Sequence, residues 1–180
     1  MQASYATLTS LCQASCSRSD ASLQQMLTMI IEQLRITIEQ PQQGNSKIME
    51  VQFVLCGLVQ VIMVRVGASV PTEVAERIVA LIINSFQQHQ RVTEAGLIAY
   101  QGVCIGLKER VPIREFGQYI YNALEQEDDE DVTRVAIGLV IDIADGLREQ
   151  VSQYLSSLIP HMLNVLRNGK RKQDTKLAAI

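Results

Sequence analysis

The chain has 180 residues, a net charge of −3 and 47% hydrophobic residues, which supply a substantial core and exclude a disordered chain. Aromatic residues make up 4% and Trp is absent, so the core must consist mainly of Leu, Ile, Val and Ala. This composition favours helices over strands. With no excess of basic residues, nucleic acid is not expected as a direct partner.

Helical periodicity, interrupted by Pro, Gly and polar links, predicts nine helical segments and no strand. In chain order these segments are 3–16, 19–39, 46–66, 71–86, 91–110, 113–126, 129–148, 152–167 and a last one that begins near 173. The longest link is at residues 41–46. Pro160 falls inside the segment that begins at Ser152, where we expect a kink rather than a stop.

Small residues recur along the chain at a fixed interval. Ala95, Ala136 and Ala178 follow one another about 41 residues apart, a period typical of two-helix HEAT or armadillo repeats. The predicted fold is an all-α solenoid of about four HEAT repeats, in which antiparallel helix pairs stack as a right-handed superhelix. It forms one array over 1–180, with 3–16 as the second helix of a preceding repeat, full repeats at 19–66, 71–110 and 113–148, and a truncated repeat at 152–180. Because both ends fall within a repeat, we expect a fragment of a longer solenoid.

The helix at 129–148 separates an apolar face from a polar stripe. The apolar positions at helical spacing are Val132, Val135, Ala136, Leu139, Val140, Ile143 and Leu147, with Ile137 and Ile141 as a second flank that packs against neighbours. Shifting the polar stripe by the repeat period predicts a concave, partner-binding wall. Its residues are Gln52, Gln60, Thr93, Gln101, Lys108, Arg134, Asp142, Asp145 and Glu149. The alternative is that this stripe is simply the solvated face of each helix.

An acidic run lies just before and at the start of the same helix. Its members are Glu125, Glu127, Asp128, Asp129, Glu130 and Asp131. One interpretation is electrostatic attraction of a basic peptide. The other is structural, because acids at a helix start supply its cap and complement its dipole. The run lacks the alternation and the Gly of a calcium loop.

The basic run at 169–172 superficially resembles a localisation signal or a phosphate loop. It lacks the upstream Gly and the following Ser or Thr of a P-loop. We therefore expect its Lys and Arg side chains, near the end of a helix, to complement the carbonyl end of that same helix. Cys12 and Cys16 are one helical turn apart, but no second Cys pair accompanies them, and His89 and His161 are isolated. We therefore expect no metal site and no cofactor.

Catalytic and membrane signatures are also missing from the pattern. No motif places a Ser or Cys nucleophile at a strand-to-helix elbow, and neither His has a carboxylate partner at motif spacing, so no catalytic residue and no enzyme activity is predicted. We find no signal peptide and no apolar run of membrane length, and expect no membrane insertion. Since all four Cys residues lie in apolar helical stretches, a reduced, intracellular protein is expected.

Three segments resemble one family in order and spacing. They are Ala-Ser-Tyr-Ala-Thr-Leu at 3–8, Leu-Gln-Gln-Met-Leu-Thr-Met-Ile-Ile-Glu-Gln-Leu at 23–34 and Val-Ala-Ile-Gly-Leu-Val-Ile-Asp-Ile-Ala at 135–144. Together they are similar to importin-β, the karyopherin-β nuclear import receptors, over essentially the whole chain. The corresponding region is about four repeats just past the middle of a longer receptor. This chain departs from the pattern at Thr133, where such repeats often carry Arg.

The resemblance implies a receptor that carries protein into the nucleus. Its implied partners are the importin-α adaptor or a basic cargo segment, Ran-GTP and the FG nucleoporins, and its implied location is the cytoplasm, the nucleus and the nuclear pore. The Trp-bearing helices that clamp the adaptor in this family have no counterpart here, because the chain has no Trp. The alternative is a HEAT-repeat scaffold of another assembly, similar to a phosphatase A-subunit or an adaptin.

Overall fold

The fold is known from a computed structural model that describes residues 10, 20–40, 46–111, 113–147 and 152–179. The expected helix at 3–16, with Cys12 and Cys16, lies outside these residues. Within them the chain forms helices and no strand. The α-helices are α2 (Asp20–Glu39), α3 (Ser46–Val66), α4 (Thr72–His89), α5 (Glu94–Leu107), α6 (Ile113–Glu125), α7 (Glu130–Leu147), α8 (Ser152–Arg167) and α9 (Gln173–Ala178), with the 3₁₀ turns η2 (Gly67–Ser69) and η3 (Lys108–Arg110).

Helix boundaries follow the local chemistry of the chain. Pro71 precedes the first residue of α4, a position where its missing N–H removes no hydrogen bond. Gln90 ends α4 in the left-handed conformation, with a φ angle of 54°. Pro160 lies inside α8, which continues to Arg167, so this proline does not stop the helix.

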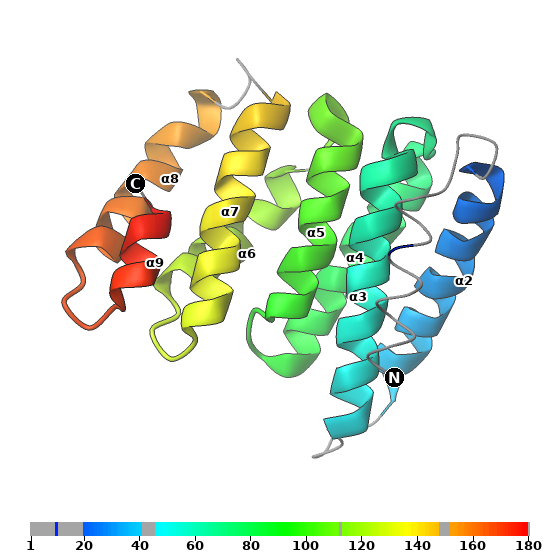
Figure 1. The fold of residues 1–180 in the computed structure, drawn as a ribbon, viewed down its shortest axis with the longest axis horizontal. Helices are drawn as coiled ribbons and strands as arrows, with labels where there is room; N and C mark the ends of the chain where they lie inside the picture. Colours follow the sequence, from blue (N-terminus) through cyan, green and yellow to red (C-terminus); the bar gives the residue numbers. More distant parts are fainter. Residues whose placement is uncertain (1–9, 11–19, 41–45, 112, 148–151, 180) are drawn as a thin grey trace.

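The helices form an all-α solenoid of two layers (Figure 1). The chain alternates between a first layer of α2, α4, α6 and α8 and a second layer of α3, α5, α7 and α9. The two helices of each pair, α2 with α3, α4 with α5, α6 with α7 and α8 with α9, pack against each other across the layers. Within the second layer, α5 contacts α3 on one side and α7 on the other. Helices that are far apart in the sequence thus lie side by side at the interval of one repeat.

Glycines bring two helices of the second layer into backbone contact. A Cβ atom added at Gly102 would lie 2.4 Å from the Cα atom of Gln60, and one at Gly106 would lie 2.2 Å from the carbonyl oxygen of Met63. Without side chains at these positions, α5 approaches α3 more closely than helices of the first layer approach one another. Close packing of α3, α5 and α7 makes this part of the second layer shorter than the first, as expected of the concave side of a solenoid.

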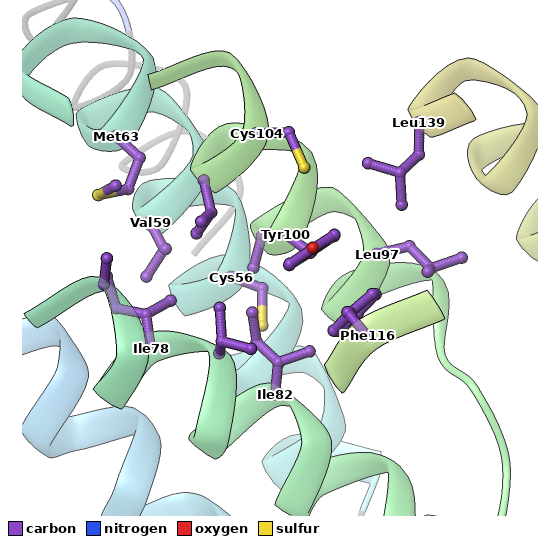
Figure 2. Packing of buried hydrophobic residues seen from close by; sticks show 14 of the residues in the cluster. Cys56, Val59, Met63, Ile78, Ile82, Leu97, Tyr100, Cys104, Phe116 and Leu139 are labelled. Carbon is purple, nitrogen blue, oxygen red and sulfur yellow. The ribbon is translucent and has the colours of Figure 1, made fainter. Parts of the chain in front are cut away.

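The core fills the space between the layers. Its centre is a stacked pair, Tyr100 of α5 and Phe116 of α6, whose ring centroids are 3.5 Å apart, and both side chains are fully buried (Figure 2). Cys56 and Cys104 are free thiols buried in the same cluster. Burial raises the pKa of the Cys56 thiol to about 12, so this side chain serves as an apolar packing group.

The expectation that no apolar run reaches membrane length is wrong for one helix. The span Lys47–Ser69 is long and apolar enough to cross a membrane by length and composition, with a mean hydropathy of 1.9. Half of that apolar window is buried inside the fold, because α3 packs against α2 and α5. A helix placed between neighbours is apolar around most of its circumference, which accounts for the composition.

The second apolar flank predicted for α7 is half correct. Ile137 is fully buried, as expected of a residue between stacked helices, but Ile141 is 52% exposed. The two residues are four positions apart on one side of α7, so this flank is covered at Ile137 and open to solvent at Ile141. Ile141 therefore adds an apolar side chain to the surface of the second layer.

Candidate protein-binding surface

Three polar side chains form a continuous ladder across the second layer. The amide Nε2 of Gln60 in α3 donates to Oε1 of Gln101 in α5 at 2.9 Å, and Nε2 of Gln101 donates to a carboxylate oxygen of Asp142 in α7. Each step spans 41 residues, the interval of one repeat. All three side chains are half-buried. Asp142 carries the one carboxylate among these three side chains, so the negative charge of the ladder lies at its α7 end.

The predicted stripe divides into two sets that face different directions. Residues eight positions apart are about 80° apart around a helix, so Gln52, Thr93 and Arg134 cannot share the face of the ladder. Gln52 is 6% exposed, and its Nε2 donates to the carbonyl oxygen of Thr37, which corrects its placement on an exposed wall. Thr93 is the N-cap of α5 and accepts a hydrogen bond from the Gly96 amide.

Three members of the predicted wall, Lys108, Asp142 and Asp145, lie toward the C-terminal ends of α5 and α7. Lys108 and Asp145 are exposed and line a hollow of about 610 Å³ between α5 and α7. Asp142 lies in the wall of this hollow as well, so it joins the ladder to the two exposed charges. Arg134 is exposed at the other end of α7 and is paired with Asp131. Glu149 lies outside the described residues.

A second hollow, of about 420 Å³, opens at the N-terminal ends of α3 and α5, and we call it the α3–α5 hollow. Its apolar lining includes Met49 and Phe53, which are 56% and 45% exposed. Phe53 lies seven residues before Gln60, two helical turns away on the same face. The polar pattern of the sequence does not identify these two residues, since an apolar side chain is assigned to the core when only the sequence is known.

Most residues of the acidic run are paired with other groups of the fold, although Glu125, Glu127 and Asp131 are exposed. Asp129 pairs with Arg91 at 2.6 Å, and its Oδ1 accepts the Val132 amide at 3.2 Å, so it caps α7 as the structural interpretation requires. Glu125 lies 2.9 Å from Nδ1 of His161 in α8. Five of the six acids have such partners, and Asp128 is exposed at the turn.

Two of these acids connect the run to the next repeat. A hydrogen bond from Asn168 and the charge of Lys170, 3.5 Å away, lower the pKa of the Glu127 carboxyl. Burial pushes the pKa of Glu130 upward, but hydrogen bonds from Thr175 and from the backbone of Lys172 outweigh it and leave the pKa lowered. Most carboxylates of the acidic run therefore cap α7 or bind groups of a neighbouring repeat.

The expectation that the basic run at 169–172 complements the carbonyl end of its own helix is wrong for Arg171, which binds a carbonyl of α6 instead. Arg171 is 6% exposed and donates to the carbonyl oxygen of Leu124 near the end of α6, 3.1 Å away. Arg110 acts similarly in the second layer, where it donates to the carbonyl oxygens of Gly67, Ala68 and Val70 after α3. In both cases an arginine of one repeat binds carbonyls of the preceding repeat.

The buried hydroxyl at Thr133 explains the departure noted in the sequence. Its Oγ1 lies 3.2 Å from the carbonyl oxygens of Ala123 and Gln126 and 3.3 Å from that of Asp129. The side chain is fully buried, so a long charged Arg has no room there. Among the described residues, no group of three or more His, Cys, Asp or Glu side chains is placed to hold a metal ion.

The ladder, the two hollows and the close-packed second layer define the class of molecule, an α-solenoid with a polar inner wall. A family model described as importin subunit beta-1-like, TPR repeats, matches residues 1–180, and the chain belongs to this family. Importin subunit beta-1 of Arabidopsis thaliana is 23% identical over 188 residues, covering 97% of this chain. The chain spans about a fifth (21%) of that relative's length.

Two solved structures share the fold. A crystal structure of importin beta in an ammonium sulfate condition superposes with a TM-score of 0.86 at 22% identity, covering 97% of this chain and 21% of that chain. A second, in a polyethylene glycol condition, gives a TM-score of 0.85 at 21% identity, covering 97% and 22%. Both support the two-layered solenoid described above.

Proposed function

We propose that this segment is part of a nuclear transport receptor and that its second layer binds a basic protein segment. The observation that carries the proposal is the ladder of Gln60, Gln101 and Asp142, which continues across three repeats of the second layer. Concave faces of solenoids offer an extended surface to which a partner chain can bind along several repeats. The family match favours this function over a phosphatase or adaptin scaffold.

The charged end of the ladder gives the expected polarity of binding. Asp142 and Asp145 face the α5–α7 hollow, and Lys108 and Glu109 lie on its other side. Arg110 also lines this hollow, but its guanidinium is engaged by backbone carbonyls. Carboxylates are then in excess at this end, and a Lys or Arg side chain of a partner fits them better than an acidic one.

The partners proposed are the importin-α adaptor or a basic cargo segment, Ran-GTP and the FG nucleoporins, and the proposed location is the cytoplasm, the nucleus and the nuclear pore. Binding, not catalysis, is the proposed activity. Because each repeat contacts only its neighbours, small shifts between repeats add up along a solenoid. A partner that contacts several repeats can in this way alter the curvature of the whole stack.

The proposal is tested by binding of a basic importin-α N-terminal peptide, and of Ran loaded with a GTP analogue, to this chain and to a chain extended by neighbouring repeats. We expect reversal of both charges, Asp142→Lys with Asp145→Lys, to weaken peptide binding by about tenfold or more. Reversal of Glu73 and Glu76, exposed on the outer helix α4, is the matched control. Equal binding by both double variants would contradict the proposal.

A further inference from the structure

The α3–α5 hollow differs from the ladder because its floor is apolar. Leu34, Ile38, Cys56 and Ile82 contribute buried surface from α2, α3 and α4. Met49 and Phe53 line the same hollow from α3 and leave about half of their side-chain surface exposed. Exposed apolar surface beside an apolar floor is stabilised when another apolar side chain covers it.

Negative charge surrounds this apolar floor. Glu50, Glu94 and Asp129 line the hollow together with Arg91 and His89. Arg91 is engaged by Asp129 at 2.6 Å, so the carboxylates of Glu50 and Glu94 form the excess charge. Burial and the nearby Asp131 and Asp129 raise the pKa of Glu94, an effect that Arg134 only partly offsets. A cation placed beside Glu94 would relieve this repulsion.

We propose that the α3–α5 hollow anchors a cationic protein segment, which places one apolar side chain against Phe53 and Met49 and an adjacent Lys or Arg beside Glu50 and Glu94. This rests on the proposed function and specifies where along the second layer such a segment is held. Phe53 lies on the same face of α3 as Gln60, two turns away, so one extended chain reaches both the hollow and the ladder.

The chemistry of the hollow separates this occupant from others. Phosphate groups of nucleic acids would face Glu50, Glu94 and Asp129, which repel them. An uncharged apolar peptide would cover the floor but gain nothing from the carboxylates. A segment that combines both chemistries gains apolar burial and charge attraction at one place.

The test uses the 180-residue chain with isotope-labelled methionine methyl groups and a short synthetic peptide in which arginines flank one leucine. We expect the peptide to shift the methyl signal of Met49, at the mouth of the hollow, and to leave that of Met29 unchanged. Met29 is a suitable internal control because it is 68% exposed on α2 and does not line the hollow. Loss of binding with the peptide's leucine changed to serine is also expected.

Matched variants of the protein separate the contribution of apolar contact from that of charge attraction. Phe53→Ser should weaken binding by about tenfold, the effect of losing one apolar side-chain contact, and Val64→Ser should not. Val64 is 48% exposed on the same helix and lies outside the hollow. Glu50→Lys should weaken binding and reduce its dependence on salt, whereas Glu73→Lys on α4 should not. Glu50 is exposed, so this variant tests the site even if Phe53→Ser does not fold.

The anchor proposal is wrong if the peptide binds with no shift at Met49, or if its serine version or a neutral version binds equally well. These results are distinct from failure of the proposed function. Importin-α peptide binding that depends on Asp142 and Asp145, without a Met49 shift, would overturn the anchor alone. A Met49 shift that needs both leucine and arginines, with no binding of importin-α or Ran, would support the anchor and contradict the transport role.

Discussion

Gly102 of α5 lies directly against the backbone of Gln60 in α3. A Cβ atom at this position would be 2.4 Å from the Cα atom of Gln60 and 2.8 Å from its carbonyl oxygen. Neither atom can move without displacing the helix, unlike the end of a flexible side chain. The contact therefore sets the spacing of the two helices, and with it the geometry at which Gln60 reaches Gln101.

We predict that Gly102→Ala lowers the free energy of unfolding by about 1–3 kcal/mol or more, because the added methyl group forces α5 away from α3. Gly138→Ala in α7 is the matched control, since no atom lies within 4 Å of a Cβ built there. There the change should stabilise the helix by up to about 1 kcal/mol. Urea unfolding followed by circular dichroism measures both, and a stabilising Gly102→Ala would contradict the close contact.

The second prediction concerns Arg110, whose guanidinium binds three carbonyl oxygens of η2 and the residue after it. Arg110→Met keeps much of the apolar stem and removes these charged hydrogen bonds, and should cost about 1.5–3 kcal/mol of stability. Arg134→Met removes an exposed pair with Asp131 and should cost at most about 1 kcal/mol. Similar losses in the two variants, measured by thermal unfolding, would show that the carbonyl contacts contribute little.

Backbone strain at Lys108 gives a third prediction. Its φ of 53° and ψ of −119° form a conformation that residues with a side chain rarely adopt. Lys108→Gly should therefore stabilise the fold by about 1 kcal/mol or more. Gln90→Gly should gain less, because Gln90 has the ordinary left-handed angles of 54° and 24°. The comparison is made by chemical denaturation, and a larger gain at Gln90 would argue against strain at Lys108.

The fourth prediction is a pH dependence at His89. Burial, and secondarily Arg91, lower the pKa of this imidazole below its ordinary 6.5. At pH values between the lowered pKa of the folded state and 6.5, the unfolded chain binds more protons than the folded one. The free energy of unfolding therefore falls as the pH falls below 6.5. His89→Gln should reduce the slope of unfolding free energy against pH in that window. An unchanged slope in denaturant titrations above and below 6.5 would contradict the assignment.

Much of the fold was predictable because its signals are local. Helical periodicity, and prolines such as Pro71 and Pro112, gave the predicted helix limits. The regular interval of Ala95 and Ala136 indicated stacking, and the acidic cap at Asp129 follows from its place before α7. Each of these depends on residues within a few turns of one another, or on a repeat of the same pattern.

The binding surface was less predictable because it depends on angles and on distant neighbours. A shift by one repeat aligned Gln60 with Gln101 correctly, but it also included Gln52, which turns toward α2 and is buried. Arg171 donates a hydrogen bond to a carbonyl oxygen of α6, and no local sequence pattern predicts this acceptor. The sequence pattern does not identify Phe53 as a surface residue, because an apolar residue on a helix is assigned to the core until its exposure is known.

The carbonyl contacts of Arg110 and Arg171 have a direction along the chain. In each case a later repeat supplies the donor and an earlier repeat supplies the acceptors. During synthesis, the carbonyl groups at the end of a helix pair would lack their arginine donor until the next repeat leaves the ribosome. Each repeat would therefore gain its last hydrogen bonds only after the next one has been made, so the repeats would be completed in the order of translation.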